Sequence, residues 1–80
     1  MVRNKIKSLL KMFDKSNKDA AESLGMPYYS FTNKINQRGF STEELIKIAE
    51  LTGTQLCFID KSTGETIIKF DPEDIKKDTE

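Results

Sequence analysis

Residues 19–53 read DAAESLGMPYYSFTNKINQRGFSTEELIKIAELTG, and this stretch decides the fold. Helix-forming residues stop at Gly25, the position expected just past the end of a helix over 17–24. Pro27 then opens another helix, because its missing N–H is harmless at the first helical position. This helix, the third of the chain, runs over 27–36. The stretch therefore begins with two short helices joined by a tight turn.

Two further helices flank this pair. Ser41, followed three residues later by Glu44, forms a capping box that predicts a helix over 42–52. Before the pair, the apolar residues of 4–13 recur with helical spacing, which predicts an amphipathic helix. The positions expected to face the core are Ile6, Leu9, Leu10, Phe13, Phe31, Ile35, Leu45, Ile48, Ala49 and Thr52.

The hydrophobic period changes from 3.6 to 2 after Gly53. TQLCFID and ETIIKFD are rich in β-branched and aromatic residues, and KSTG between them suits a short loop, so a β-hairpin is expected over about 54–71. Both faces of the hairpin carry apolar side chains: one can cover the helices, and the other needs a partner. The acidic tail, 72–80, is expected to fray.

The fold class expected is therefore mainly α. Four helices, two of them joined by a tight turn, are followed by a C-terminal two-stranded β-hairpin, and the whole of 1–80 forms one domain. A chain of 80 residues is large enough for a single small domain and too small to enclose a deep pocket.

Composition removes several classes of function. With no His and a single Cys, the chain lacks the usual zinc ligands and any Ser-His or Cys-His nucleophile pair. We therefore expect no metal site, no cofactor, no small-molecule ligand and no enzymatic activity. No apolar run approaches the roughly 20 residues that span a bilayer. An unpaired Cys57 suits a reducing compartment, so a cytoplasmic, nucleoid-associated protein with no membrane partner is expected.

Charge is distributed unevenly along a chain whose formal net charge is zero. Residues 1–40 carry eight basic and three acidic side chains, a net of +5, whereas 41–80 carry five basic and ten acidic ones, a net of −5. Such asymmetry suggests that the first half faces an anionic partner. Chance scatter of solvated charges on a small domain is the alternative.

The two short helices fit the steric requirements of a helix-turn-helix. Ala21 supplies a small residue where the two helices cross, Gly25 permits a left-handed turn four residues later, and Phe31 anchors the next helix in the core. This spacing is moderately specific.

Over residues 17–53 the sequence also resembles the repressor-like (lambda repressor/XRE-type) helix-turn-helix transcriptional regulators, in particular the small bacterial or phage type. The resemblance implies a compact helical bundle whose third helix enters the major groove of DNA. Two features depart from the family pattern: Pro27 lies in the turn, and the acidic hairpin replaces a fifth helix. The residues that match are Ala21, Leu24, Gly25, Phe31, Lys34, Ile35, Phe40, Ser41, Glu44, Leu45, Ile48 and Ala49.

Helix geometry indicates which side chains would touch DNA. With Phe31 and Ile35 inward, polar and aromatic residues at the front of the third helix point outward, toward base edges. The expected base contacts are Tyr28, Tyr29, Thr32, Asn33 and Asn36. Phosphate contacts are expected at the start of the second helix and around the end of the third. These are Asn17, Lys18, Lys34, Gln37 and Arg38.

Purely structural roles remain open for several of these residues. Tyr28 can instead pack beside Phe31 in the core, and Asn36 with Gly39 can simply end the helix. The lysines at positions 5, 7 and 11 are interpreted as the solvated face of the first helix. Cys57 is interpreted as a small hydrophobic residue.

The function expected is a sequence-specific regulator of transcription, most simply a repressor that binds a palindromic operator in double-stranded DNA as a homodimer. The unused face or edge of the hairpin, represented by Cys57, Ile59 and Ile67, is the expected dimer contact. The alternative is a protein-interaction module, such as an antitoxin or anti-repressor, that uses the acidic second half.

Overall fold

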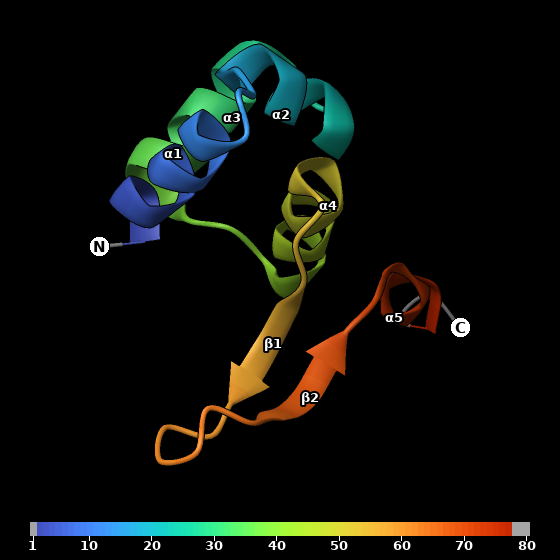
Figure 1. The fold of residues 1–80 in the computed structure, drawn as a ribbon. Helices are drawn as coiled ribbons and strands as arrows, with labels where there is room; N and C mark the ends of the chain where they lie inside the picture. Colours follow the sequence, from blue (N-terminus) through green and yellow to red (C-terminus); the bar gives the residue numbers. More distant parts are fainter. Residues whose placement is uncertain (1, 78–80) are drawn as a thin grey trace.

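The computed structural model describes residues 2–77 and is mainly helical with one two-stranded antiparallel sheet, as the sequence predicts (Figure 1). In chain order the elements are α1 (Val2–Met12), α2 (Asn17–Leu24), α3 (Tyr28–Asn33), the π-helical turn η1 (Lys34–Arg38), α4 (Thr42–Thr52), β1 (Leu56–Ile59), β2 (Thr66–Phe70) and α5 (Pro72–Lys77). None of these helices combines the length and apolarity needed to cross a bilayer.

Local capping explains the bounds of α2 and α4. The predicted capping box of α4 is confirmed: the Ser41 N–H donates to Glu44 Oε1 at 2.9 Å, and the Glu44 N–H donates to Ser41 Oγ at 3.2 Å. Ser16 and Asp19 form an equivalent box at the start of α2. Each helix ends at a glycine in the left-handed conformation, so α2 and α4 begin and end where the sequence places them.

The core lies where α1, α2, α3 and α4 meet. Phe31 is fully buried at its centre, and its ring is 5.5 Å from that of Phe40. Ala20 and Ala21 are also buried, so α2 can pack closely against both α3 and α4. The buried members of this cluster are Ile6, Leu10, Ala20, Ala21, Leu24, Phe31, Ile35 and Ile48.

Three expected core positions are not fully buried: Phe13 is exposed, and Leu9 and Leu45 are half-buried against the core. Phe13 is exposed, because α1 ends at Met12 and the chain turns away there. Leu45 is only half-buried, whereas its neighbour Ile46, which the helical pattern did not single out, is buried. The reason is tertiary: α5 packs against α4 and lines a pocket with Ile46 on that side.

The third helix is not α-helical over the whole of 27–36 as expected. Regular α-helix covers Tyr28–Asn33, and the chain continues as the wider turn η1, in which the Gly39 N–H donates to the Lys34 carbonyl at 2.7 Å. Gly39 then ends this turn with φ 80° and ψ −177°, a conformation that is essentially restricted to glycine.

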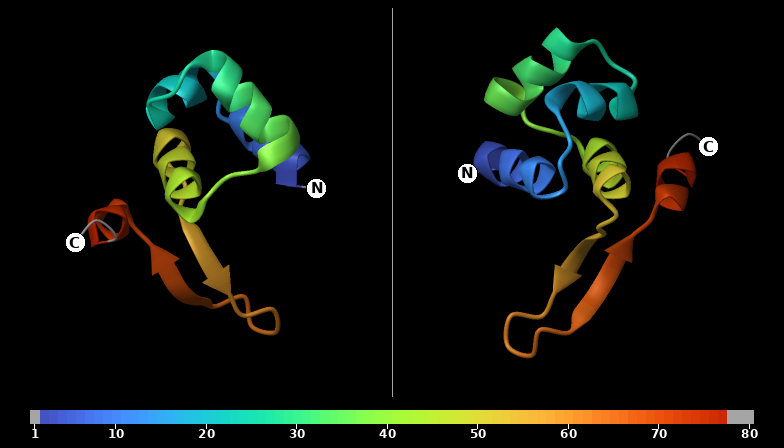
Figure 2. Two further views of the ribbon diagram at one scale, coloured as in Figure 1. Left: turned by 180° about the vertical axis from the view of Figure 1, so that it is seen from behind. Right: turned by 45° about the horizontal axis from the view of Figure 1, so that its top comes forward.

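The hairpin projects away from α1, α2 and α3 instead of covering them (Figures 1 and 2). Its register pairs Leu56 with Phe70 and Phe58 with Ile68, and a bulge follows between Phe58 and Ile59. Leu56, Cys57 and Phe70, near the helices, are half-buried, whereas Phe58, Ile59, Ile67 and Ile68 are exposed. The expectation that one face covers the helices is therefore wrong, because only the base of the hairpin reaches α4.

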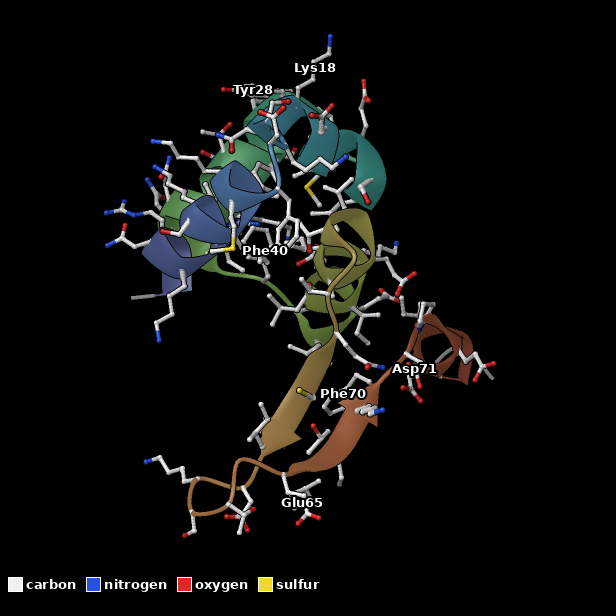
Figure 3. The ribbon with its side chains drawn as sticks, in the orientation of Figure 1. Lys18, Tyr28, Phe40, Glu65, Phe70 and Asp71 are labelled. Carbon is white, nitrogen blue, oxygen red and sulfur yellow. The ribbon has the colours of Figure 1, made fainter. Side chains whose placement is uncertain are left out.

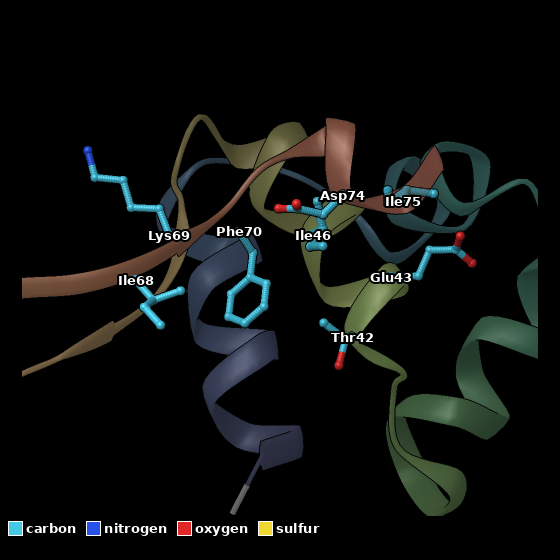
Figure 4. A pocket seen from close by; sticks show the side chains of 8 residues that line it. All are labelled: Thr42, Glu43, Ile46, Ile68, Lys69, Phe70, Asp74 and Ile75. Carbon is cyan, nitrogen blue, oxygen red and sulfur yellow. The ribbon is translucent and has the colours of Figure 1, made fainter. Parts of the chain in front are cut away.

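The expected frayed tail is helical over Pro72–Lys77, and residues 78–80 lie outside the described part. Two contacts order its start: the Asp71 N–H donates to Asp74 Oδ2 at 2.7 Å, and Gln55 Nε2 donates to Asp71 Oδ1 at 2.7 Å. Between α5, β2 and α4 lies a pocket of about 320 Å³, shown in Figure 4. The tail is therefore part of the fold up to Lys77.

Candidate nucleic-acid interface

The outer side of α3 carries the aromatic and polar residues that the sequence analysis assigns to base contacts. Tyr28 and Tyr29 are 55% and 70% exposed, and Asn33 is also exposed. Phe31 and Ile35, on the opposite side, are buried and hold the helix in place. The alternative that Tyr28 belongs to the core is wrong.

Thr32 is less available than these three residues. Its side chain is half-buried, and its hydroxyl donates to the Tyr28 carbonyl at 2.7 Å, one helical turn back. This bond uses the hydroxyl proton within the helix. Thr32 can therefore offer a ligand its methyl group and the two acceptor lone pairs of its hydroxyl oxygen.

Residues of the π-helical turn continue the exposed surface beyond α3. Asn36, Gln37 and Arg38 are all exposed. Asn36 lies inside the turn and does not end it, whereas Gly39 does. Such turns are frequent at functional sites, and the wider winding changes the direction of these side chains from that of a continued α-helix. Nothing in the sequence pattern predicts it.

The start of α2 lies at the same end of the molecule as the start of α3. Figure 3 shows Lys18 and Tyr28 at the same end of the view, with the Lys18 side chain extending outward. Lys18 is exposed and Asn17 is half-buried. Because Ser16 caps the Asp19 N–H, the backbone N–H groups of Asn17 and Lys18 are without a hydrogen-bond acceptor within residues 2–77.

Lys34 does not extend freely as a phosphate contact would. Its ammonium lies 3.1 Å from Glu44 Oε2, and both side chains are largely buried. Burial of the Glu44 carboxyl raises its pKa, but the hydrogen bond from the Ser41 backbone, followed by the hydrogen bond and charge of Lys34, lowers it by more. The pKa of Glu44 is therefore below its ordinary value of 4.5.

The electrostatic surroundings of α3 are basic. No acidic residue occurs between Glu22 and Glu43 in the sequence, so α3 and η1 carry only cations. At the α2 end, the carboxyl of Asp19 accepts the Ser16 backbone N–H, which lowers its pKa below the ordinary value of 3.8. That carboxylate is directed into its own helix cap.

The sequence analysis interpreted Lys7 and Lys11 of α1 as a solvated face and gave Arg3 no role, but the structure places all three beside these regions. Arg3 shares a pocket of about 300 Å³ with Asn36 and Gln37 of η1. Lys7 and Lys11 line a groove that also contains Asn17. The signal that could have found them is the four-residue interval at which Arg3, Lys7 and Lys11 recur, which places them on one side of a helix.

The residues expected at a dimer contact lie far from this surface. Ile59 and Ile67 are more than half exposed on the hairpin, and Cys57 is a half-buried free thiol. The opposite face is open as well, because Phe58 and Ile68 are also more than half exposed. The sequence analysis missed this second exposed face because it placed it against the helices.

The structure thus leaves Tyr28, Tyr29 and Asn33 exposed on α3, Lys18 exposed and Asn17 half-buried at the start of α2, and Asn36, Gln37 and Arg38 exposed on η1. It ties Lys34 to α4 and places the hairpin residues elsewhere. Comparison with protein-family models, with curated proteins and with solved structures finds no match to this chain.

Proposed function

We propose that this protein is a sequence-specific double-stranded DNA-binding regulator of transcription, in which α2 and α3 act as a helix-turn-helix and α3 enters the major groove. The observation that carries the proposal is the outer side of α3, where exposed Tyr28, Tyr29 and Asn33 project from a helix anchored by a fully buried Phe31. A rigid helix with polar tips and no acidic residues suits base edges surrounded by phosphates.

The two ends of α3 offer the accompanying phosphate contacts. At one end are Lys18 and the two uncapped N–H groups of α2, which suit a phosphate oxygen. At the other end are Gln37 and Arg38. Phosphate contacts at both ends of α3 would set its register on the duplex. The side chains between these contacts would select the base sequence.

A homodimer supplies the specificity that one copy lacks. Five base-reading side chains, at the low end of about 1–3 kcal/mol each, fall short of the roughly 8 kcal/mol that about 10⁶ competing genomic sites represent. We infer that two copies join through the exposed hairpin and bind a palindromic operator, and that the simplest consequence is repression by occlusion of a promoter.

A second candidate function rests on the same hairpin. Its open apolar faces, together with the net negative charge of residues 41–80, also suit a basic protein partner, as in an antitoxin or anti-repressor. The two functions differ in their response to salt, because binding to DNA releases counterions.

The test is a fluorescence-anisotropy titration of a labelled duplex of about 30 base pairs at salt concentrations from about 50 to 200 mM. The proposal predicts an affinity that falls steeply with salt, with a log-log slope of about −0.9 for each phosphate neutralised. A failure to bind duplex, or a flat salt response, would contradict it and favour the protein-interaction module.

A further inference from the structure

We propose that α1 carries a second DNA-contacting surface, a basic stripe of Arg3, Lys7, Lys11 and Lys15, that follows the phosphate backbone beside the groove entered by α3. This inference rests on the proposed function and adds to it residues that the helix-turn-helix itself does not contain. The stripe would hold one DNA strand along the length of the reading helix, not only at its two ends.

Helix geometry places the stripe on one flank of α1. Arg3, Lys7 and Lys11 are exposed and are separated by four residues, which is about 6 Å along a helix axis. Lys15 lies beyond the end of α1, but it lines the same groove as Lys7 and Lys11. A strand of B-DNA carries one phosphate for about every 3.4 Å of its axis, so three cations spread over roughly 12 Å face several phosphates.

The flank that bears the stripe is the one next to the proposed interface. At one end, α1 packs against η1, and Arg3 shares a pocket with Asn36 and Gln37. At the other end, Lys7, Lys11 and Lys15 line the groove that holds Asn17. The stripe therefore joins the two sets of phosphate contacts proposed at the opposite ends of α3.

Three of the four stripe cations, Arg3, Lys7 and Lys11, are exposed, whereas Lys15 is half-buried and its charge helps to lower the pKa of the Asp19 carboxyl. Among the side chains that the structure describes, the one ion pair is Lys34 with Glu44, so none of the four stripe cations is paired. Two carboxylates line the same groove, those of Asp14 and Asp19. The Asp19 carboxylate accepts the Ser16 N–H in the cap of α2. Asp14 is the other carboxylate of this groove, and it takes part in no cap.

The pattern fits a rigid polyanion better than an anionic lipid surface. Membrane-binding helices combine their cations with exposed apolar side chains that insert between lipids. On α1 the exposed Met12 and the half-buried Leu9 line a different hollow, together with Lys5, on the other flank. The exposed residues of the stripe flank, by contrast, are the cations Arg3, Lys7 and Lys11.

Lys5 therefore provides a matched control, since it is an exposed lysine of the same helix on the opposite flank. The experiment compares wild type, the double variant Lys7→Gln/Lys11→Gln and the single variant Lys5→Gln. Each is titrated against a labelled random-sequence duplex over the salt range of about 50 to 200 mM. Thermal unfolding followed by circular dichroism checks that all three retain the fold.

The double variant should lose about 1.8 from the magnitude of the log-log slope and bind roughly 60-fold more weakly at about 0.1 M salt. Lys5→Gln should match wild type. If wild type binds the duplex but the double variant has the same slope as Lys5→Gln, the stripe is overturned while the proposed function stands. If wild type binds no duplex, both fall. Loss of binding to anionic vesicles, with duplex binding unchanged, would also overturn the stripe.

Discussion

At the scale of single residues, the proposed interface divides into side chains that choose a sequence and side chains that only hold DNA. Asn33 is exposed on α3 and carries both a donor and an acceptor, which match an adenine edge. Lys18 is a cation at the start of α2, where it can meet only a phosphate. The two residues should therefore fail differently when they are replaced.

Asn33→Ala should cost about 1–3 kcal/mol on a cognate duplex and relax the preference at one or two base pairs. Lys18→Ala should weaken every duplex alike and reduce the magnitude of the salt slope by about 1. Anisotropy titrations on one selected and one random duplex measure both effects. Equal losses for both variants on both duplexes would refute this division of roles.

The Lys34–Glu44 pair supplies a second test at this scale. Glu44→Gln keeps an oxygen that can accept the Ser41 N–H, but it releases Lys34 from the ion pair. Because the Lys34 side chain is 28% exposed and can turn its freed ammonium to water, the loss of stability should be only about 1 kcal/mol. The freed ammonium should increase the magnitude of the DNA salt slope by about 0.9.

Glu50→Gln is the matched control for this variant, because it removes the same charge from the other end of α4 without touching Lys34. An unchanged slope in Glu44→Gln, or an equal change in both variants, would show that Lys34 does not reach phosphate even when it is free.

At the scale of elements, the caps of α2 and α4 make stability depend on pH. The pKa of Asp19 and that of Glu44 both lie below their ordinary values of 3.8 and 4.5 in the folded chain. A lowered pKa stabilises the fold above the unfolded pKa, and this contribution is lost as pH falls through the folded value. The two capped helices should therefore weaken together below about pH 4.

Urea unfolding at about pH 5 and about pH 2.5 measures this loss. The urea midpoint of wild type should be lower at the more acidic pH. The midpoint of the double variant Asp19→Asn/Glu44→Gln should decrease by less, because its caps no longer titrate. Glu50→Gln, which takes part in neither cap, should behave as wild type. An equal fall in the double variant would place the acid sensitivity elsewhere.

How far each element follows from sequence depends on whether its determinants are local. The bounds of α2 and α4 are predicted because Ser41, Glu44, Gly25 and Gly53 act within one turn of the chain. The two strands follow from the alternation of apolar residues, whereas their register, which pairs Phe58 with Ile68, was not predicted.

Features that depend on distant contacts were not predictable in the same way. Helix α5 is ordered by Gln55, which lies 16 residues before Asp71, and the burial of Ile46 depends on that helix. In the candidate site, the exposure of Tyr28, Tyr29 and Asn33 follows from helical periodicity. The ion pair between Lys34 and Glu44 does not follow from periodicity, because it depends on how close η1 and α4 lie in space.

At the scale of the whole molecule, the helices and the hairpin form two parts with different exposure. The helices enclose the core, whereas Phe58, Ile59, Ile67 and Ile68 of the hairpin are between 55% and 64% exposed. A lone two-stranded hairpin is marginally stable in water, and β1 carries no charged residue that would protect its open edge. The hairpin therefore has the properties of an unfilled interface.

A standard interface of about 800 Å² per partner would cover about an eighth of the 6006 Å² surface of one copy. We expect a dimer at micromolar concentration in sedimentation, and Ile59→Lys/Ile67→Lys should convert it to a monomer with weaker binding to a palindromic duplex. Ser62→Lys, in the exposed loop, is the control for added charge. A wild-type monomer that binds DNA one to one would contradict the dimer.

The central claim is that α3 reads the sequence of a DNA duplex, and selection of bound duplexes from a random pool tests it most directly. The account predicts enrichment of an inverted repeat whose half-sites lie about 34 Å apart, centre to centre, and loss of the preference at one position of each half-site in Asn33→Ala. A pool that remains random after repeated selection, or one whose enriched sequence is unchanged by every substitution on α3, would contradict the claim.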